Sequence, residues 1–270
     1  MRRAPGAQRA IVLQAGWAIM RDALHAEWTK LRTAPGTIWL LLAVITLTVA
    51  VSLAATATVS CPFGGCEVDP TKVSLTGITL GQAVVAILAV LAMSGEYGTG
   101  MIRTSLTAVP RRTVVLAAKA AILTGLVVPA ATIAVLASLL AGRPILADHG
   151  YQQLPLTDGS VLRAAVGSVL YLALIALLSL GAASAVRDSA TAIAIVLGLL
   201  YVFPIIVQAV SDPDWRRHLQ QIAPMSGLAI QATTHLSSLP ISPWAGLGVL
   251  AAWAAAALLI GGLLLQLRDA

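Results

Sequence analysis

The chain has 270 residues, of which 58% are hydrophobic and only 10% are charged, and its mean hydropathy is +0.89. Soluble domains carry about 25% charged residues, so this composition excludes a soluble enzyme and a disordered chain. The net charge of +6 needs no nucleic-acid partner to explain it, because positive charge gathers at the cytoplasmic ends of membrane spans. The sequence therefore indicates an integral membrane protein.

Residues 1–37 are predicted to form a cytoplasmic N-terminal segment with an amphipathic helix that ends at Pro35-Gly36. Apolar residues recur there at steps of three and four, and most charged residues fall elsewhere on the helical wheel. The pattern is typical of a helix in the cytoplasmic headgroup layer, and it fits docking to a cytoplasmic partner equally well. The apolar positions are Leu13, Trp17, Met20, Leu24, Trp28 and Leu31.

Residues 38–270 are predicted to form an all-α domain of six transmembrane helices. A helix needs about 20 apolar residues to cross about 30 Å of hydrocarbon. Six runs have that length: 38–59, 73–93, 120–140, 164–186, 190–210 and 244–265. None of these runs contains Asp, Glu, Lys, Arg or His, which disfavours a proton-driven pump. The first run is too long for a cleaved signal peptide.

The distribution of Lys and Arg predicts that both termini are cytoplasmic. With the N-terminus inside, 12 of these residues flank the spans on the inside and five lie outside, as the positive-inside rule requires. The outer cations are Lys72, Arg143, Arg163, Arg216 and Arg217, and Lys119 is counted in the inner connection before the third span.

Three connections carry further signals. Cys61 and Cys66 flank a Gly-Gly pair in the first outer loop, where a disulfide would act as a loop staple. Residues 94–112 form an inner connection in which Ile102, Leu106 and Val109 are spaced as one face of a short helix. Residues 211–243 are too apolar for a free loop and too broken for a span, which predicts short interfacial or re-entrant helices packed on the bundle.

Motifs for chemistry are absent from the sequence. It contains no HExxH zinc motif, no nucleophile elbow, no dinucleotide fingerprint and no P-loop. The chain is therefore not expected to be an enzyme by itself or to hold a cofactor or metal. If it transports against a gradient, the energy must come from another protein.

Two segments together resemble the permease subunit of ABC-2 type bacterial ABC transporters. They are EWTKLRT, at residues 27–33, and GEYGTGMIRTSLTAVPRR, at residues 95–112. In that family a Glu-aromatic-x-x-Gly stretch, a short apolar helix and a basic end lie between the second and third spans. Those places are taken here by Glu96, Tyr97 and Gly100, by 101–109, and by Arg111 with Arg112.

The resemblance implies a multi-pass subunit of the bacterial plasma membrane that pairs with an identical or related permease and with two cytoplasmic ATPase subunits. Those ATPases, which bind ATP and Mg, would dock on the loop helix and the N-terminal helix. The residues expected to couple the two proteins are Glu96, Tyr97, Gly100, Ile102, Arg103, Leu106, Val109, Arg111 and Arg112. Those of the N-terminal helix are Trp17, Leu24, Glu27, Trp28, Lys30 and Arg32, with Glu96 expected to pair with Lys30 or Arg32.

The substrate cavity that the resemblance implies would be lined by spans one, two and five. The positions expected there are Thr46, Thr48, Tyr201, Phe203 and Gln208. An uncharged cavity favours export of an amphipathic or hydrophobic drug, antibiotic, peptide or lipid. The alternative is a passive channel or secondary transporter without an ATPase partner; a membrane enzyme or an assembly scaffold is a third alternative.

Overall fold

The computed structural model describes residues 35–60, 68–98, 112–151, 155–186, 188–234 and 236–267, with Arg21, Leu24, His25, Trp28 and Thr29. These residues form helices and turns and include no β-strand. Six helical stretches are long and apolar enough to cross a membrane. The expectation of an all-helical, multi-pass membrane protein is therefore confirmed.

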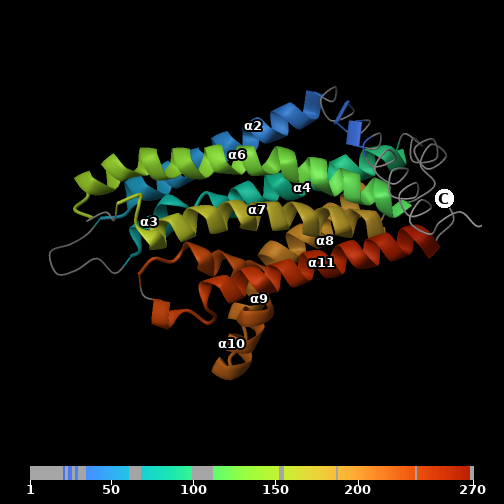
Figure 1. Cartoon of the computed structure of the whole chain (residues 1–270). Helices are drawn as coiled ribbons and strands as arrows, with labels where there is room; N and C mark the ends of the chain where they lie inside the picture. Colours follow the sequence, from blue (N-terminus) through green and yellow to red (C-terminus); the bar gives the residue numbers. More distant parts are fainter. Residues whose placement is uncertain are drawn as a thin grey trace, which may run out of the picture.

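The helices follow one another up and down the bundle (Figure 1). The spans are α2 (Pro35–Thr58), α3 (Pro70–Ser74) with α4 (Ile78–Gly98), α6 (Arg112–Asp148) and α7 (Gly159–Val186). The fifth span is α8 (Ser189–Leu197), the π-helical η1 (Gly198–Val202) and α9 (Phe203–Gln208), and the sixth is α11 (Pro243–Leu267). Between the last two spans lie α10 (Pro213–Ile222) and the 3-10 helices η2 (Pro224–Gln231) and η3 (Leu236–Ser238).

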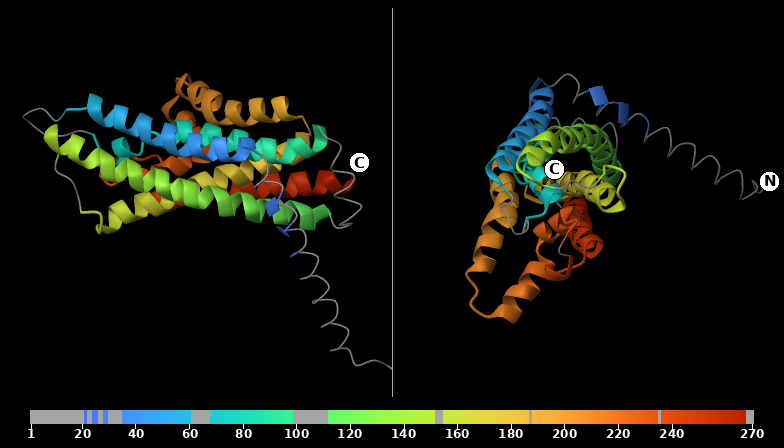
Figure 2. Two further views of the ribbon diagram at one scale, coloured as in Figure 1. Left: turned by 90° about the horizontal axis from the view of Figure 1, so that it is seen from above. Right: turned by 90° about the vertical axis from the view of Figure 1, so that its left-hand side faces the viewer.

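The two ends of the bundle carry different elements. The start of α2, the end of α4, the start of α6 and the end of α11 lie together at one end, which we call the α11 end (Figure 1). The short helix α3 lies at the opposite end, which we call the α3 end. The connection of residues 211–242, drawn in orange and red-orange, lies closer to the α3 end than to the α11 end. Seen end-on in Figure 2, α8, α9 and α10 project on one side of the other helices.

Proline and aspartate explain several helix starts. Pro35, Pro70, Pro213 and Pro243 each occupy the first position of a helix, where the missing N–H is not needed. Aspartates cap α3, α8 and α10 by accepting backbone N–H bonds.

The third and fifth spans differ most from the expected ones, while the second is divided into α3 and α4 and the fourth begins earlier, at Gly159. The third span was expected at 120–140, but α6 is 37 residues long and remains helical through Pro129 and Pro144. The charged residues on either side of the apolar run therefore belong to the same helix. A helix can extend beyond the hydrocarbon layer, because its backbone N–H and C=O groups bond to one another along its length. In the fifth span the α-helix widens into the π-helix η1 just before Pro204. Proline has no N–H to donate to the preceding turn.

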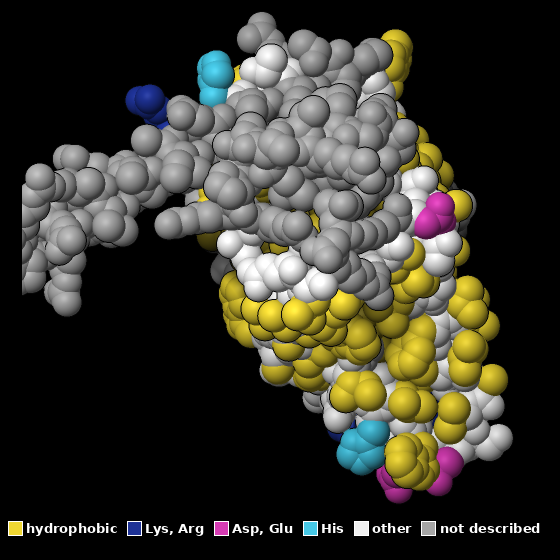
Figure 3. Space-filling model, turned by 90° about the vertical axis from the view of Figure 1, so that its right-hand side faces the viewer, with side chains coloured by type: hydrophobic (Ala, Val, Ile, Leu, Met, Phe, Trp, Pro, Cys, Tyr) yellow, Lys and Arg dark blue, Asp and Glu magenta, His cyan; other side chains and the backbone are white. Residues whose placement is uncertain are grey.

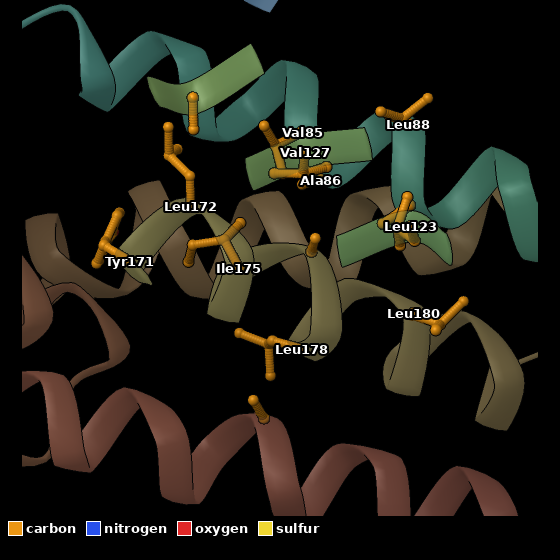
Figure 4. Close-up of a cluster of buried hydrophobic side chains, with 14 of the residues drawn as sticks. Val85, Ala86, Leu88, Leu123, Val127, Tyr171, Leu172, Ile175, Leu178 and Leu180 are labelled. Atoms are coloured by element: carbon orange, nitrogen blue, oxygen red, sulfur yellow. The ribbon is translucent and has the colours of Figure 1, made fainter. Parts of the chain in front are cut away.

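The core lies around α7, which packs against α4, α6, α8, α11 and η2. Figure 4 shows side chains of α4 and α6, such as Val85 and Val127, above Leu172 and Ile175 of α7, with Leu178 turned toward α11. The outer faces are apolar as well: Trp39 is 72% exposed and Leu259 is 68% exposed. Figure 3 shows apolar side chains over much of the surface that grey residues leave visible. Such a surface fits a lipid environment.

Small residues set the close contact between α2 and the start of the second span. A Cβ atom added at Gly77 would lie 1.9 Å from the backbone oxygen of Thr48, and one at Gly81 would lie 2.3 Å from the Thr48 hydroxyl. The Gly77 N–H also donates to the Ser52 hydroxyl at 3.1 Å. The spacing of these glycines thus serves helix packing.

Candidate functional site

The segment expected to couple to an ATPase joins α4 to α6 at the α11 end. Glu96 and Tyr97 lie in the last turn of α4, and Arg112 is the first residue of α6. The side chains of these three are outside what the structure describes. So are six expected coupling residues: Gly100, Ile102, Arg103, Leu106, Val109 and Arg111.

Part of the N-terminal helix is described. Leu24, His25, Trp28 and Thr29 are helical, and the Thr29 hydroxyl donates to the His25 carbonyl oxygen at 2.9 Å. Trp28 is 46% exposed. Trp17, Glu27, Lys30 and Arg32 lie outside the described residues. The amphipathic character of the helix and the pairing of Glu96 with Lys30 or Arg32 therefore stay predictions, and so does the disulfide, since Cys61 and Cys66 are also outside.

Lys119 is a buried cation that joins the two helices flanking this segment. It lies in the second turn of α6, is 2% exposed, and donates from Nζ to the carbonyl oxygen of Ala92 on α4 at 3.0 Å. The sequence interpretation placed Lys119 in a polar connection, because the apolar run begins after it. Its only sequence signal was a single charge bordered by Ala-Ala on either side. A buried ammonium needs such a bond, since burying a charge without a partner is costly.

Asp69 organises the α3 end. Its carboxylate caps α3 by accepting the N–H groups of Thr71 and Lys72 at 3.0 and 3.2 Å. It also accepts the N–H and hydroxyl of Thr233 and the N–H of Thr234, which follow η2. Burial acts to raise the pKa of Asp69, but the bonds from Thr234, Thr233 and Lys72 together hold it below its ordinary value.

Arg163 bonds to the same stretch of chain. Its guanidinium donates from Nη2 to the carbonyl oxygen of Ala232 at 2.6 Å. Residues 232–234 are thus bonded to α7 through Arg163 and to the α3 cap through Asp69. We call this arrangement the Asp69 latch. It fixes η2, which packs between α7 and α11.

The residues expected to line a substrate cavity do not share one environment. Thr46 is exposed and bonds to its own helix at Leu42, while Thr48 is fully buried against Gly77 and Gly81. The Tyr201 hydroxyl donates to the Thr79 carbonyl oxygen, joining η1 to α4. Phe203 is half-buried and Gln208 is exposed.

Gln208 lines a cavity of about 370 Å³, which we call the η2 cavity. The cavity is open on one side and is bordered by α9, the end of α10, η2 and residues 239–241, with Lys72 of α3 at its rim. A second cavity of about 290 Å³ lies between the first turns of α6 and the last turns of α11, bordered by Leu116 and Gly262 among others. Both have the size of small-ligand sites.

A buried polar pair inside the bundle was missed by sequence reasoning. The Tyr171 hydroxyl of α7 donates to Oε1 of Gln82 on α4, and both residues are fully buried. Such a bond joins two spans where water is absent. Among the described residues, no group of three or more His, Cys, Asp or Glu side chains could hold a metal ion.

No protein-family model matches the chain, and no curated protein sequence matches it. The resemblance to ABC-2 permeases therefore rests on the six spans together with the residues at 27–33 and 95–112.

Proposed function

We propose that this chain is the membrane-spanning permease subunit of an ATP-driven ABC exporter of the ABC-2 type. It would lie in a bacterial plasma membrane with both termini in the cytoplasm and pair with a second permease and two ATPase subunits. The transported molecule would be amphipathic or hydrophobic, since the spans offer few charges to recognise an ion.

One observation carries this proposal: the segment at 99–111, which bears the apolar stripe and basic end, connects α4 and α6 at the end of the bundle where α2 begins and α11 ends (Figure 1). The two segments expected to bind a cytoplasmic ATPase, the N-terminal helix and residues 99–111, would then lie on one membrane face. The chain has no P-loop of its own, so a separate ATPase must supply the energy.

The bond from Lys119 to Ala92 suggests how a displacement of this segment would be transmitted to α4 and α6. Closure of the two ATPases would displace the segment, and the bond makes the ends of α4 and α6 move together. The bundle would then exchange between inward-open and outward-open states, whose populations ATP shifts.

The test is co-purification of the full chain with a co-expressed candidate ATPase in detergent. The variant Ile102→Asp with Leu106→Asp places two charges on the apolar stripe, and Thr104→Asp with Thr107→Asp places the same charges elsewhere on the same segment. We expect the first variant to lose the ATPase and the second to keep it, with both still folded.

Two results would contradict the proposal. One is that no candidate ATPase binds the wild-type chain. The other is solute flux through the reconstituted chain that needs no ATP and no ATPase, which would establish the passive channel or secondary transporter instead.

A further inference from the structure

The η2 cavity combines an apolar interior with a few polar groups. Ten of its fourteen lining residues are apolar, and the four polar ones are Lys72, Gln208, Gln220 and Ser226. Its volume of about 370 Å³ lies in the range of pockets that hold small ligands, which are typically apolar with a small number of polar groups. The cavity therefore has the composition of a binding site for an amphiphile.

The walls of the cavity are held in place by bonds between distant parts of the chain. The Gln221 amide donates to the Pro240 carbonyl oxygen at 2.8 Å, which fixes α10 against residues 239–241. Ala232, another wall residue, accepts from Arg163. The cavity is thus built by the fold rather than left between loosely placed loops.

Lys72 gives the site its charge preference. Its side chain is exposed at the rim, and its backbone is fixed because its N–H donates to the Asp69 carboxylate at 3.2 Å. Among the lining residues it is the one with a formal charge. An ammonium at the mouth of an apolar cavity complements a carboxylate or phosphate at the end of a hydrocarbon chain.

We propose that the η2 cavity binds the acyl chain of an anionic amphiphile, with the anionic head at Lys72. The amphiphile would be a fatty acid or an anionic phospholipid, which share this chemistry. The proposal goes beyond the exporter function and needs no ATPase, so the two can fail separately.

The experiment uses the full chain in phosphatidylcholine nanodiscs and photo-crosslinking with an oleate that carries a diazirine in its chain. The matching diazirine oleyl alcohol reports the contribution of the charge. Ala229→Phe fills the cavity, and Ala252→Phe adds the same ring to an exposed position of α11. Lys72→Gln removes the rim charge, and Arg217→Gln removes a charge from exposed α10.

We expect oleate to label peptides of η2 and α9. Lys72→Gln should lower oleate labelling by about two- to fivefold, the value of an exposed ion pair, and should leave the alcohol unchanged. Ala229→Phe should lower labelling by both probes more than tenfold, while Ala252→Phe and Arg217→Gln should match the wild type. Competition by phosphatidylglycerol would identify a membrane lipid as the occupant, and competition by free oleate alone would identify a fatty acid.

Three results would overturn the proposal. Labelling by both probes could be unchanged in a folded Ala229→Phe variant. Lys72→Gln could have no more effect on oleate than Arg217→Gln. Ala229→Phe could instead dissociate a dimer of this chain while oleate labelling stays at the wild-type level, in which case the cavity would be an interface between copies.

Discussion

Replacing Asp69 by Asn tests the Asp69 latch most directly. One carboxylate oxygen accepts the N–H groups of Thr233 and Thr234, and the other accepts those of Thr71 and Lys72 and the Thr233 hydroxyl. Asn keeps one oxygen and replaces the other by an NH₂ group, which cannot accept. In either orientation of the amide, two backbone N–H groups therefore lose their acceptor.

The expected loss follows from these two bonds. In either orientation one of the two N–H groups belongs to an exposed residue, Lys72 or Thr234, and can turn to water. Losing the bond of the exposed N–H costs about 1 kcal/mol, because water takes the place of the carboxylate, and the buried unsatisfied donor costs about 1–3 kcal/mol, so the loss should be about 2–4 kcal/mol. That corresponds to a fall in the apparent Tm of roughly 5–15 °C for a chain of this size.

The assay is thermal unfolding of the purified chain in detergent, followed by circular dichroism. Asp212→Asn is the matched control, because Asp212 caps only the exposed helix α10 and Asn is an equally good cap. A Tm for Asp69→Asn no lower than that for Asp212→Asn would refute the reasoning.

Three further predictions concern pH, packing and the buried lysine. Because the pKa of Asp69 is depressed, its contribution to stability is complete at neutral pH and is lost as the pH falls below about 4; Asp69→Asn should flatten the Tm profile between pH 5 and 3. Gly77→Ala should lower the free energy of unfolding by about 1–3 kcal/mol by forcing α2 away. Gly125→Ala, where an added Cβ meets no atom of another element within 4 Å, should raise it by up to about 1 kcal/mol; equal Tm values for the two variants would contradict this. Lys119→Met should speed amide hydrogen exchange at the ends of α4 and α6. The Tm change should be equivalent to less than about 2 kcal/mol, because the cost of burying the ammonium disappears together with its bond. Unchanged exchange would show that the bond does not hold these ends together.

The positions of the six spans could be read from the sequence because each is an uninterrupted apolar run, which only a helix can carry through lipid. Helix ends could not, since Lys119 and Arg143 interrupt the apolar pattern but not the helix α6. The turn at η1 depends on the local effect of Pro204 and on packing, which periodicity does not report.

The site was predictable to a smaller extent. The cavity wall at Gln208 was among the expected positions, but the Asp69 latch joins residues 164 positions apart. The Tyr171–Gln82 pair spans 89 positions. The cap at Asp69 is a local pattern, but nothing in the sequence near either residue of such a pair identifies its distant partner, so only the packing of the helices brings them together.

The length of α6 has a mechanical consequence. At 1.5 Å per residue its 37 residues extend about 55 Å, whereas the hydrocarbon layer is about 30 Å thick. Pro129 lies close to the midpoint of the helix and removes one backbone bond there. A helix that tilts as one rigid rod by about 5° about this midpoint moves each end by about 2 Å in opposite directions, whereas bending at Pro129 moves one half alone.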